Sequence, residues 1–171
     1  MDKNNIILIG MPSCGKTTIG KILSESIHKD FIDTDHFLEK SVGLSPREMV
    51  IQHGEKFFLN KQEEILLASD FSNTVVSTGG SVVYSKKLMQ KFSCCGFIVY
   101  LKNSVDELYK RLGSGRHIIG STDNDFFKLY RQRDVLYTRY AHITLDCSNH
   151  NLVDIVKMLR MEVIKHGQHD W

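Results

Sequence analysis

The segment Gly10-Met-Pro-Ser-Cys-Gly-Lys-Thr17 has the spacing G-x-x-x-x-G-K-[ST] and directly follows the apolar run Ile6-Ile7-Leu8-Ile9. This spacing, after a strand and before a helix, is typical of a loop that surrounds phosphate groups with backbone N–H groups. Gly10 and Gly15 permit the turns of such a loop because they lack a Cβ atom. We therefore predict an ATP site formed by Gly10, Ser13, Cys14, Gly15, Lys16, Thr17 and Thr18.

Two side chains of this loop suit phosphoryl transfer. Lys16 supplies a positive charge for the outer phosphates, and Thr17 can offer its hydroxyl group to Mg²⁺. A helix expected from Lys16 to about Ser26 would point its positive dipole end at the phosphates. Cys14 is expected to be a tolerated loop residue, although an exposed thiol at this place would oxidise easily. The alternative for the whole segment is a glycine-rich turn that binds nothing.

Two carboxylates, Asp33 and Asp35, follow a short strand expected around Phe31-Ile32. If the segment is extended, both side chains project to the same side and can face one ligand. The alternative is that the pair caps the helix that follows, where aspartate is also favoured. Both carboxylates are expected near the phosphate site, because ligands of open parallel sheets bind beyond the carboxyl ends of the strands.

Two further glycine-rich segments are candidates for ligand contact. Thr78-Gly79-Gly80-Ser81 follows the apolar run Thr74-Val75-Val76, at a place where backbone must approach something closely. Residues 113–123 contain glycines, a single arginine, Arg116, and no apolar periodicity, which is typical of a mobile lid. A plain turn and a solvated loop charge are the alternatives.

The elements that must position these residues alternate between strands and helices. Apolar runs predict strands near residues 6–9, 31–32, 73–77, 96–101 and 143–145. Helical periodicity or capping signals predict helices near residues 16–26, 36–40, 46–53, 55–69, 85–91, 104–112, 124–140 and 152–163. This alternation predicts an α/β fold in which helices cover both faces of a five-stranded parallel sheet.

Composition narrows the class of protein. A chain of 171 residues suggests one domain over residues 1–171 that folds without disulfides. The four cysteines have no metal-site spacing, and a net charge of +2 gives no reason to expect a nucleic-acid partner. No apolar run is long enough for a membrane span. We expect a cytoplasmic monomer that acts on a small molecule.

At this point the chain resembles the shikimate kinase family, a nucleoside-monophosphate-kinase-like group with the P-loop NTPase fold. The resemblance rests on the following segments: 10–20, Ile-Asp-Thr-Asp at 32–35, His-Gly-Glu-Lys-Phe-Phe at 53–58, Ser-Thr-Gly-Gly at 77–80, Arg116, and Arg133-x-x-Leu-Tyr137. It implies ATP and Mg²⁺ as cofactors and phosphorylation of shikimate to shikimate 3-phosphate, in aromatic amino acid biosynthesis.

The resemblance also implies roles for single residues. Asp33 would hold Mg²⁺ through water, and Asp35 would bind the acceptor hydroxyl and act as its base. Arg116 would close over ATP from the lid. Arg133 would grip the acceptor carboxylate, for which the two parallel donors of a guanidinium are well suited. Gly79 and Gly80 would place N–H groups beside the acceptor.

The chain departs from the family pattern mainly on the acceptor side. Leu59 stands where the family has a second carboxylate-binding arginine, Gln62 where it has a glutamate, and Ser81 where it has a third glycine. The chain also departs from the family pattern at His117-Ile118-Ile119, which follow the lid arginine, and at two later positions, Val135 and Leu152. Two alternatives therefore stay open, a related kinase with a different hydroxylated acceptor and a nucleotide-binding regulatory module without catalysis.

Overall fold

The computed structural model describes residues 4–112 and 126–166, and the expected lid at 113–123, with Arg116, lies outside these residues. Five parallel strands form one sheet in the order β2-β3-β1-β4-β5. Their bounds are β1 Asn5–Ile9, β2 Asp30–Asp33, β3 Thr74–Ser77, β4 Gly96–Lys102 and β5 Ile143–Asp146. The predicted α/β fold with a five-stranded parallel sheet is confirmed.

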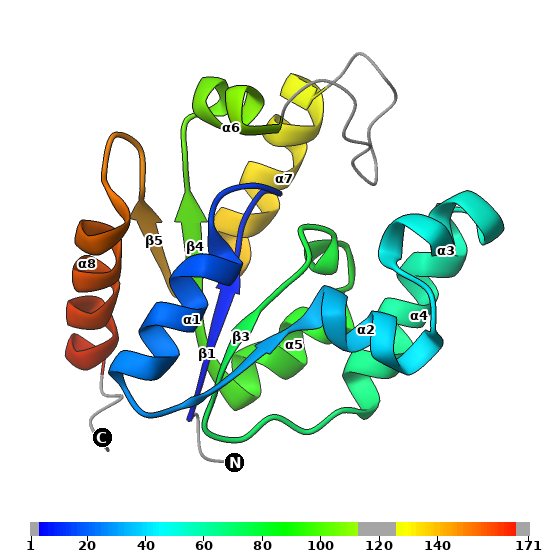
Figure 1. The fold of residues 1–171 in the computed structure, drawn as a ribbon, viewed down its shortest axis with the longest axis horizontal. Coiled ribbons are helices and arrows are strands. Elements are labelled where there is room, and N and C mark those ends of the chain that lie inside the picture. Colours follow the sequence, from blue (N-terminus) through cyan, green and yellow to red (C-terminus); the bar gives the residue numbers. More distant parts are fainter. Residues whose placement is uncertain (1–3, 113–125, 167–171) are drawn as a thin grey trace.

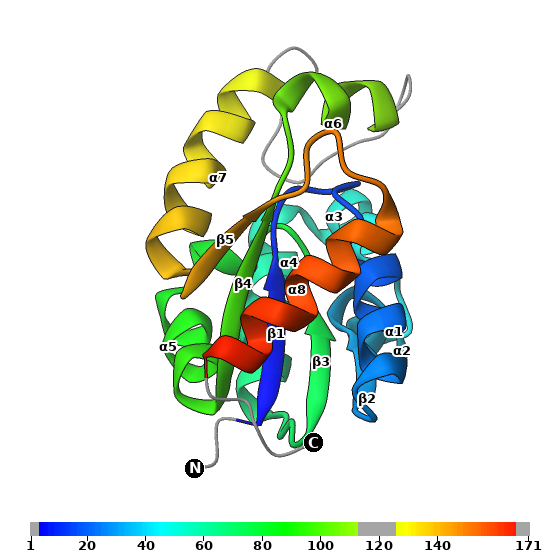
Figure 2. The same cartoon turned by 90° about the vertical axis from the view of Figure 1, so that its left-hand side faces the viewer.

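Helices lie on both faces of this sheet. Their bounds are α1 Lys16–Ser26, α2 Thr34–Val42, α3 Pro46–His53, α4 Glu55–Ala68, η1 Val82–Tyr84 (a 3₁₀ helix), α5 Lys86–Cys95, α6 Val105–Leu112, α7 Phe126–Tyr140 and α8 Leu152–Lys165. In Figure 2 the sheet lies between α1 on one side and α5 and α7 on the other. Figure 1 shows α2, α3 and α4 gathered beyond the β2 edge of the sheet.

The main core consists of the inner strands and the helix faces that cover them. Every residue of β1 and β3 is buried, as is every residue of β4 except Lys102. Such continuous apolar runs are what a parallel sheet covered on both faces requires. A second, smaller cluster lies among α2, α3 and α4 and is built on Leu38, Met49 and Phe58. The helices beyond β2 thus have an apolar centre of their own.

Local signals explain where two of the helices begin. Ser45 accepts a hydrogen bond from the N–H of Glu48, whose carboxylate accepts one from the N–H of Ser45, so a capping box starts α3 with Pro46 in its first turn. Ser85 caps α5 by accepting from the N–H of Leu88 at 3.1 Å. These two predicted helix starts are confirmed, although α5 continues to Cys95 instead of ending near Lys91.

The prediction for the segment around Asp35 was wrong. We expected Asp33 to Asp35 to be extended, but α2 begins at Thr34, so Asp35 lies in the first turn of a helix. The physical reason is that Asp33 caps α2: its Oδ1 atom accepts hydrogen bonds from the N–H groups of Asp35 at 3.0 Å and His36 at 3.4 Å.

In the described part of the chain no helix is long and apolar enough to cross a membrane.

Candidate functional site

The glycine-rich loop after β1 has the backbone conformation that its glycines predict. Gly10 has φ 150° and Gly15 has φ 97°, and Ser13 between them has φ 65°. A Cβ atom on Gly10 would lie only 2.8 Å from the carbonyl oxygen of Leu101 on the neighbouring strand β4. Both glycines are therefore required, Gly10 by its φ angle and a close approach of backbone, and Gly15 by its φ angle.

Lys16 lies inside this loop. Its side chain is 7% exposed, and its Nζ atom donates hydrogen bonds to the carbonyl oxygens of Gly10 at 2.9 Å and Met11 at 2.7 Å. Nζ is also 3.5 Å from the Sγ atom of Cys14. Cys14 is buried, so the exposed, easily oxidised thiol that we considered for this position is not present. The loop itself thus holds the ammonium group at its centre.

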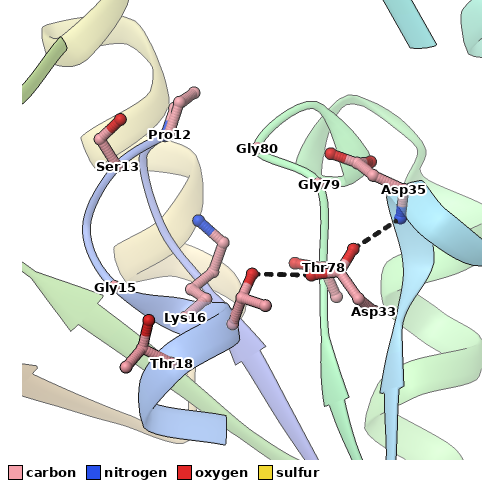
Figure 3. A pocket seen from close by; sticks show the side chains of 11 residues that line it. Pro12, Ser13, Gly15, Lys16, Thr18, Asp33, Asp35, Thr78, Gly79 and Gly80 are labelled. Atoms are coloured by element: carbon pink, nitrogen blue, oxygen red, sulfur yellow. Dashed lines mark hydrogen bonds between the residues drawn. The ribbon is translucent and has the colours of Figure 1, made fainter. Parts of the chain in front are cut away.

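Thr17 and Asp33 bring α1 and the end of β2 together. The Thr17 hydroxyl donates to Oδ2 of Asp33 at 2.7 Å, while Oδ1 of the same carboxylate caps α2 (Figure 3). Asp33 therefore both caps the helix and faces the phosphate loop, so the two interpretations of this residue do not compete. A hydroxyl and a carboxylate oxygen at the mouth of a phosphate loop are hard ligands of the kind that Mg²⁺ prefers.

This donor set fits Mg²⁺ better than a metal held by protein alone. Among the described residues there is no group of three or more histidine, cysteine, aspartate or glutamate side chains that could hold a metal ion. Magnesium usually keeps several waters and binds one or two protein oxygens together with substrate phosphates. Thr17 and Asp33 are the two protein oxygen donors that such a site needs.

Thr34 and Gly79 connect the end of β2 to the loop after β3. The N–H of Gly79 donates to the buried Thr34 hydroxyl at 2.9 Å. A Cβ atom on Gly79 would lie 3.2 Å from Cγ of Asp35 and still closer to its Oδ1 atom. The Asp35 carboxylate is therefore packed against the Gly79 backbone, and only glycine leaves room for it there. Figure 3 shows Asp35 beside Gly79 and Gly80.

These segments enclose one cavity of about 350 Å³ beyond the carboxyl ends of the strands. Its lining residues are Pro12, Ser13, Gly15, Lys16, Thr17, Thr18, Asp33, Asp35, Thr78, Gly79 and Gly80. The structure thus brings together the predicted phosphate loop, both carboxylates and the glycine pair (Figure 3). Phosphate-binding groups at one end and a carboxylate at the other allow a phosphoryl donor and a hydroxylated acceptor to meet.

Arg133 reaches this region from α7. The helix is fixed to β4 by Asp134, which accepts hydrogen bonds from the Tyr100 hydroxyl at 2.8 Å and pairs with Lys102 at 3.0 Å. One turn further along α7, the Tyr137 hydroxyl donates to the carbonyl oxygen of Gly80 at 2.7 Å. Burial raises the pKa of Tyr137, so this hydroxyl keeps its proton and stays a donor.

The Arg133 side chain itself is only 1% exposed and does not line the cavity directly. Its Nε atom donates to the hydroxyl of Tyr84 at 3.0 Å, and its Nη1 atom would be 3.0 Å from a Cβ atom on Gly80. Arg133 is therefore not an exposed charge on the helix surface. Arg133 lies directly behind the cavity wall at Gly80.

The three departures on the acceptor side lie close together. Leu59 is half-buried and packs against the second apolar cluster. Gln62, four positions from Phe58 on α4, is 2% exposed, and its Oε1 atom accepts a hydrogen bond from the Ser81 hydroxyl at 3.2 Å. Its Nε2 atom is buried and makes no hydrogen bond with the residues that the structure describes. Two neutral residues, half-buried Leu59 and buried Gln62, thus stand where the family pattern has an arginine and a glutamate.

Several residues of the site were missed by sequence reasoning. Thr34 lies between the two aspartates, so its position was the only available signal; Thr78 was included in the glycine-rich segment expected to contact a ligand, but without a role of its own. Tyr84 gave no signal, and Tyr137 appeared only within a family motif, because their contacts with Arg133 and Gly80 join segments that are 49 and 57 residues apart.

Comparison with known proteins agrees with this geometry. The family model for shikimate kinase matches residues 12–163. A shikimate kinase of Clostridium botulinum is 37% identical over 161 residues, which cover 90% of this chain and 94% of the relative. One of Caldanaerobacter subterraneus is 30% identical over 166 residues, covering 94% and 96%. The solved structure of an Acinetobacter baumannii shikimate kinase in complex with shikimate has a TM-score of 0.88 at 24% identity, covering 96% of this chain and 94% of that one.

Proposed function

The chain belongs to the shikimate kinase family, and from this membership we propose that it transfers the γ-phosphoryl group of ATP to a hydroxyl group of shikimate. The observation that carries the proposal is the single cavity in which the phosphate loop, Asp33, Asp35 and Gly79-Gly80 meet. The product is shikimate 3-phosphate, which belongs to aromatic amino acid biosynthesis.

At the nucleotide end of the cavity, the loop from Gly10 to Thr18 binds the phosphates of ATP. Lys16 is already dehydrated and bonded to two loop carbonyls, so phosphate oxygens take over as its partners without a large change of position. The charge of the ammonium group then favours the transition state, in which negative charge spreads over the transferred phosphoryl group. Arg116, which lies outside the described residues, would add a second positive charge.

The Thr17 hydroxyl and, through water, the Asp33 carboxylate would hold Mg²⁺; the Thr17 Oγ1 and Asp33 Oδ2 atoms lie 2.7 Å apart. When bound, the ion neutralises charge on the phosphates. The capping bonds from the N–H groups of Asp35 and His36 fix the orientation of the Asp33 carboxylate. Asp33 thus serves the nucleotide side, and Asp35, two residues later, serves the acceptor side.

At the acceptor end, Asp35 accepts a hydrogen bond from the shikimate hydroxyl and can take its proton as the oxygen attacks phosphorus. The carboxylate is packed against Gly79, which fixes its distance from the cavity. Gly79 and Gly80 line the same wall, and Arg133 behind Gly80 binds the carboxylate of the acceptor. Each of these groups on the acceptor side therefore has one role: Asp35 binds the hydroxyl group, Gly79 and Gly80 form the cavity wall, and Arg133 binds the carboxylate.

We also propose that the enzyme acts in the cytoplasm, because its four cysteines are free thiols, and that it acts as a monomer, because one copy of the chain supplies the phosphate loop, both carboxylates and the glycine pair. Light scattering after gel filtration tests this, and a dimer mass would contradict it.

A coupled assay of ADP release with ATP, Mg²⁺ and shikimate tests the function, with mass spectrometry of the product. Shikimate-dependent ADP release with a mass gain of one phosphate is the expected result. A related kinase with another acceptor is favoured by Leu59 and Gln62, so quinate and gluconate should be tested in parallel. ADP release with one of those acids and none with shikimate would overturn the proposal.

A further inference from the structure

Arg133 is a buried cation, and a buried charge needs partners that hold it in place. One partner is the Tyr84 hydroxyl, which accepts a hydrogen bond from Nε at 3.0 Å. The carbon at the centre of the guanidinium also lies 5.1 Å from the centroid of the Tyr84 ring. A guanidinium is planar, so a bond at Nε fixes the direction in which the two Nη atoms point. Here Nη1 points toward Gly80.

Tyr84 is well placed to set this orientation. It ends η1, whose other residues, Val82 and Val83, are fully buried in the main core. Its own N–H donates to the carbonyl oxygen of Ser81 at 3.1 Å. The short helix therefore follows directly from the Gly79-Gly80 wall of the cavity, and the tyrosine ring is carried on a rigid support. Neighbours cover more than half of the Tyr84 surface, since 40% remains exposed.

Within residues 4–112 and 126–166, helix α4 supplies no second arginine to the acceptor. Leu59 packs with the second apolar cluster, and Gln62 is bonded to Ser81, so neither residue offers a cation. Lys56, three residues before Leu59, is exposed on α4 and does not line the cavity. A lysine would also lack the planar fork that matches a carboxylate. The acceptor carboxylate thus depends on the alignment of one guanidinium.

We propose that Tyr84 is a positioning residue that fixes Arg133 for the acceptor carboxylate, and so compensates for the arginine that Leu59 replaces. The inference rests on the proposed function, because it takes a carboxylated acceptor as given. Tyr84 does not touch the reacting atoms. It acts on acceptor binding through Arg133, so its loss should change the KM for shikimate and leave kcat and the KM for ATP unchanged.

The test is Tyr84→Phe, which keeps the ring and removes the hydroxyl. We expect the KM for shikimate to rise about tenfold, which is the factor that corresponds to the loss of roughly 1.4 kcal/mol of interaction with a charged group. Tyr130→Phe is the matched control, because it removes a tyrosine hydroxyl that bonds the Asn103 carbonyl oxygen at 3.0 Å on the same helix as Arg133. Its KM for shikimate should stay within twofold of wild type.

Shikimate methyl ester separates positioning from a general loss of structure, because it has no carboxylate to bind. With the ester, wild type and Tyr84→Phe should have equal kcat/KM. In an Arg133→Lys background, which has no Nε–H, adding Tyr84→Phe should have no further effect. An unchanged KM in Tyr84→Phe, or the same loss with acid and ester, would overturn the inference.

The failure of the proposed function gives a different result. If wild type does not phosphorylate shikimate, titration calorimetry of shikimate with an ATP analogue present replaces the kinetic measurement. Shikimate binding that weakens about tenfold in Tyr84→Phe would then support the positioning role although the activity is absent. No binding of shikimate, or equal binding in both proteins, would overturn the positioning role as well.

Discussion

Gly79→Ala should remove activity while leaving the fold intact. A Cβ atom at this position would meet the carboxylate of Asp35, at 3.2 Å from Cγ and closer than real Cβ atoms come to Oδ1. The backbone is not the obstacle, because Gly79 is not among the glycines with a positive φ angle. The carboxylate must therefore move aside by about 1 Å to reach normal van der Waals contact.

This displacement sets the size of the effect. A misplacement of about 1 Å at a catalytic group can cost about a hundredfold in rate, so we expect kcat to fall by about that factor. Asp35 is a short side chain at the start of α2 and can rotate, so the free energy of unfolding should fall by less than about 1 kcal/mol, or about 3 °C in Tm. The Kd for ATP should not change.

A double-mutant cycle identifies the cause. Asp35→Ala should lower kcat by about 10²–10⁴, as expected for loss of a general base, and it also removes the atoms that the new methyl group would meet. Adding Gly79→Ala to Asp35→Ala should then change kcat less than about threefold. Coupled ADP release and thermal unfolding measure all four proteins.

Two results would refute this reasoning. Wild-type kcat in a folded Gly79→Ala protein would mean that the Asp35 carboxylate does not need its observed position. An equal loss in the presence and absence of Asp35 would mean that the methyl group obstructs the acceptor directly.

Three further predictions follow from the site and the core. Lys16→Ala should keep the fold and lose ATP affinity by titration calorimetry, and unchanged affinity would contradict the assignment of the loop. Leu59→Arg combined with Gln62→Glu should lower the KM for shikimate by roughly tenfold to a hundredfold. Gln62→Glu alone should lower the free energy of unfolding at pH 7, measured in urea, by roughly 3 kcal/mol, because it buries a carboxylate without a cation. A single variant as stable as the double variant would contradict this. Burial raises the pKa of the Cys147 thiol to about 12. Iodoacetamide at pH 8 should therefore label the exposed Cys94 and leave Cys147 unlabelled until the protein is denatured. Mass spectrometry of the labelled protein measures this.

The sequence predicted the fold well because its strongest signals are local. The apolar runs that became β1 and β4 have few other ways to bury themselves, and the four residues from Ser45 to Glu48 contain the whole signal for the start of α3. The phosphate loop is likewise a local motif, in which Gly10 and Gly15 report the required φ angles directly.

The acceptor side was harder to predict because its contacts join distant parts of the chain. Nothing near Gln62 in sequence indicates that its amide meets the Ser81 hydroxyl, 19 residues later, or that Tyr84 holds Arg133. The error at Asp35 had a local cause: a helix cap and the end of a strand use the same residue type, and capping extended the helix by two residues. Strand alternation therefore predicted an extended conformation for Asp35, which is helical, although the prediction that Asp35 lies near the phosphate site was correct.

The separate apolar cluster of Leu38, Met49 and Phe58 has an evolutionary consequence. Energetic effects of substitutions at sites that share no partners add approximately independently, so the cluster around Leu38, Met49 and Phe58 can be repacked with little effect on the stability of the sheet beneath the phosphate loop. Leu59 already belongs to this cluster, and its neighbour Gln62 lies at the boundary with the acceptor wall. Mutations that exchange one acceptor for another can therefore accumulate in this cluster and at its boundary, in a lineage that continues to bind ATP throughout.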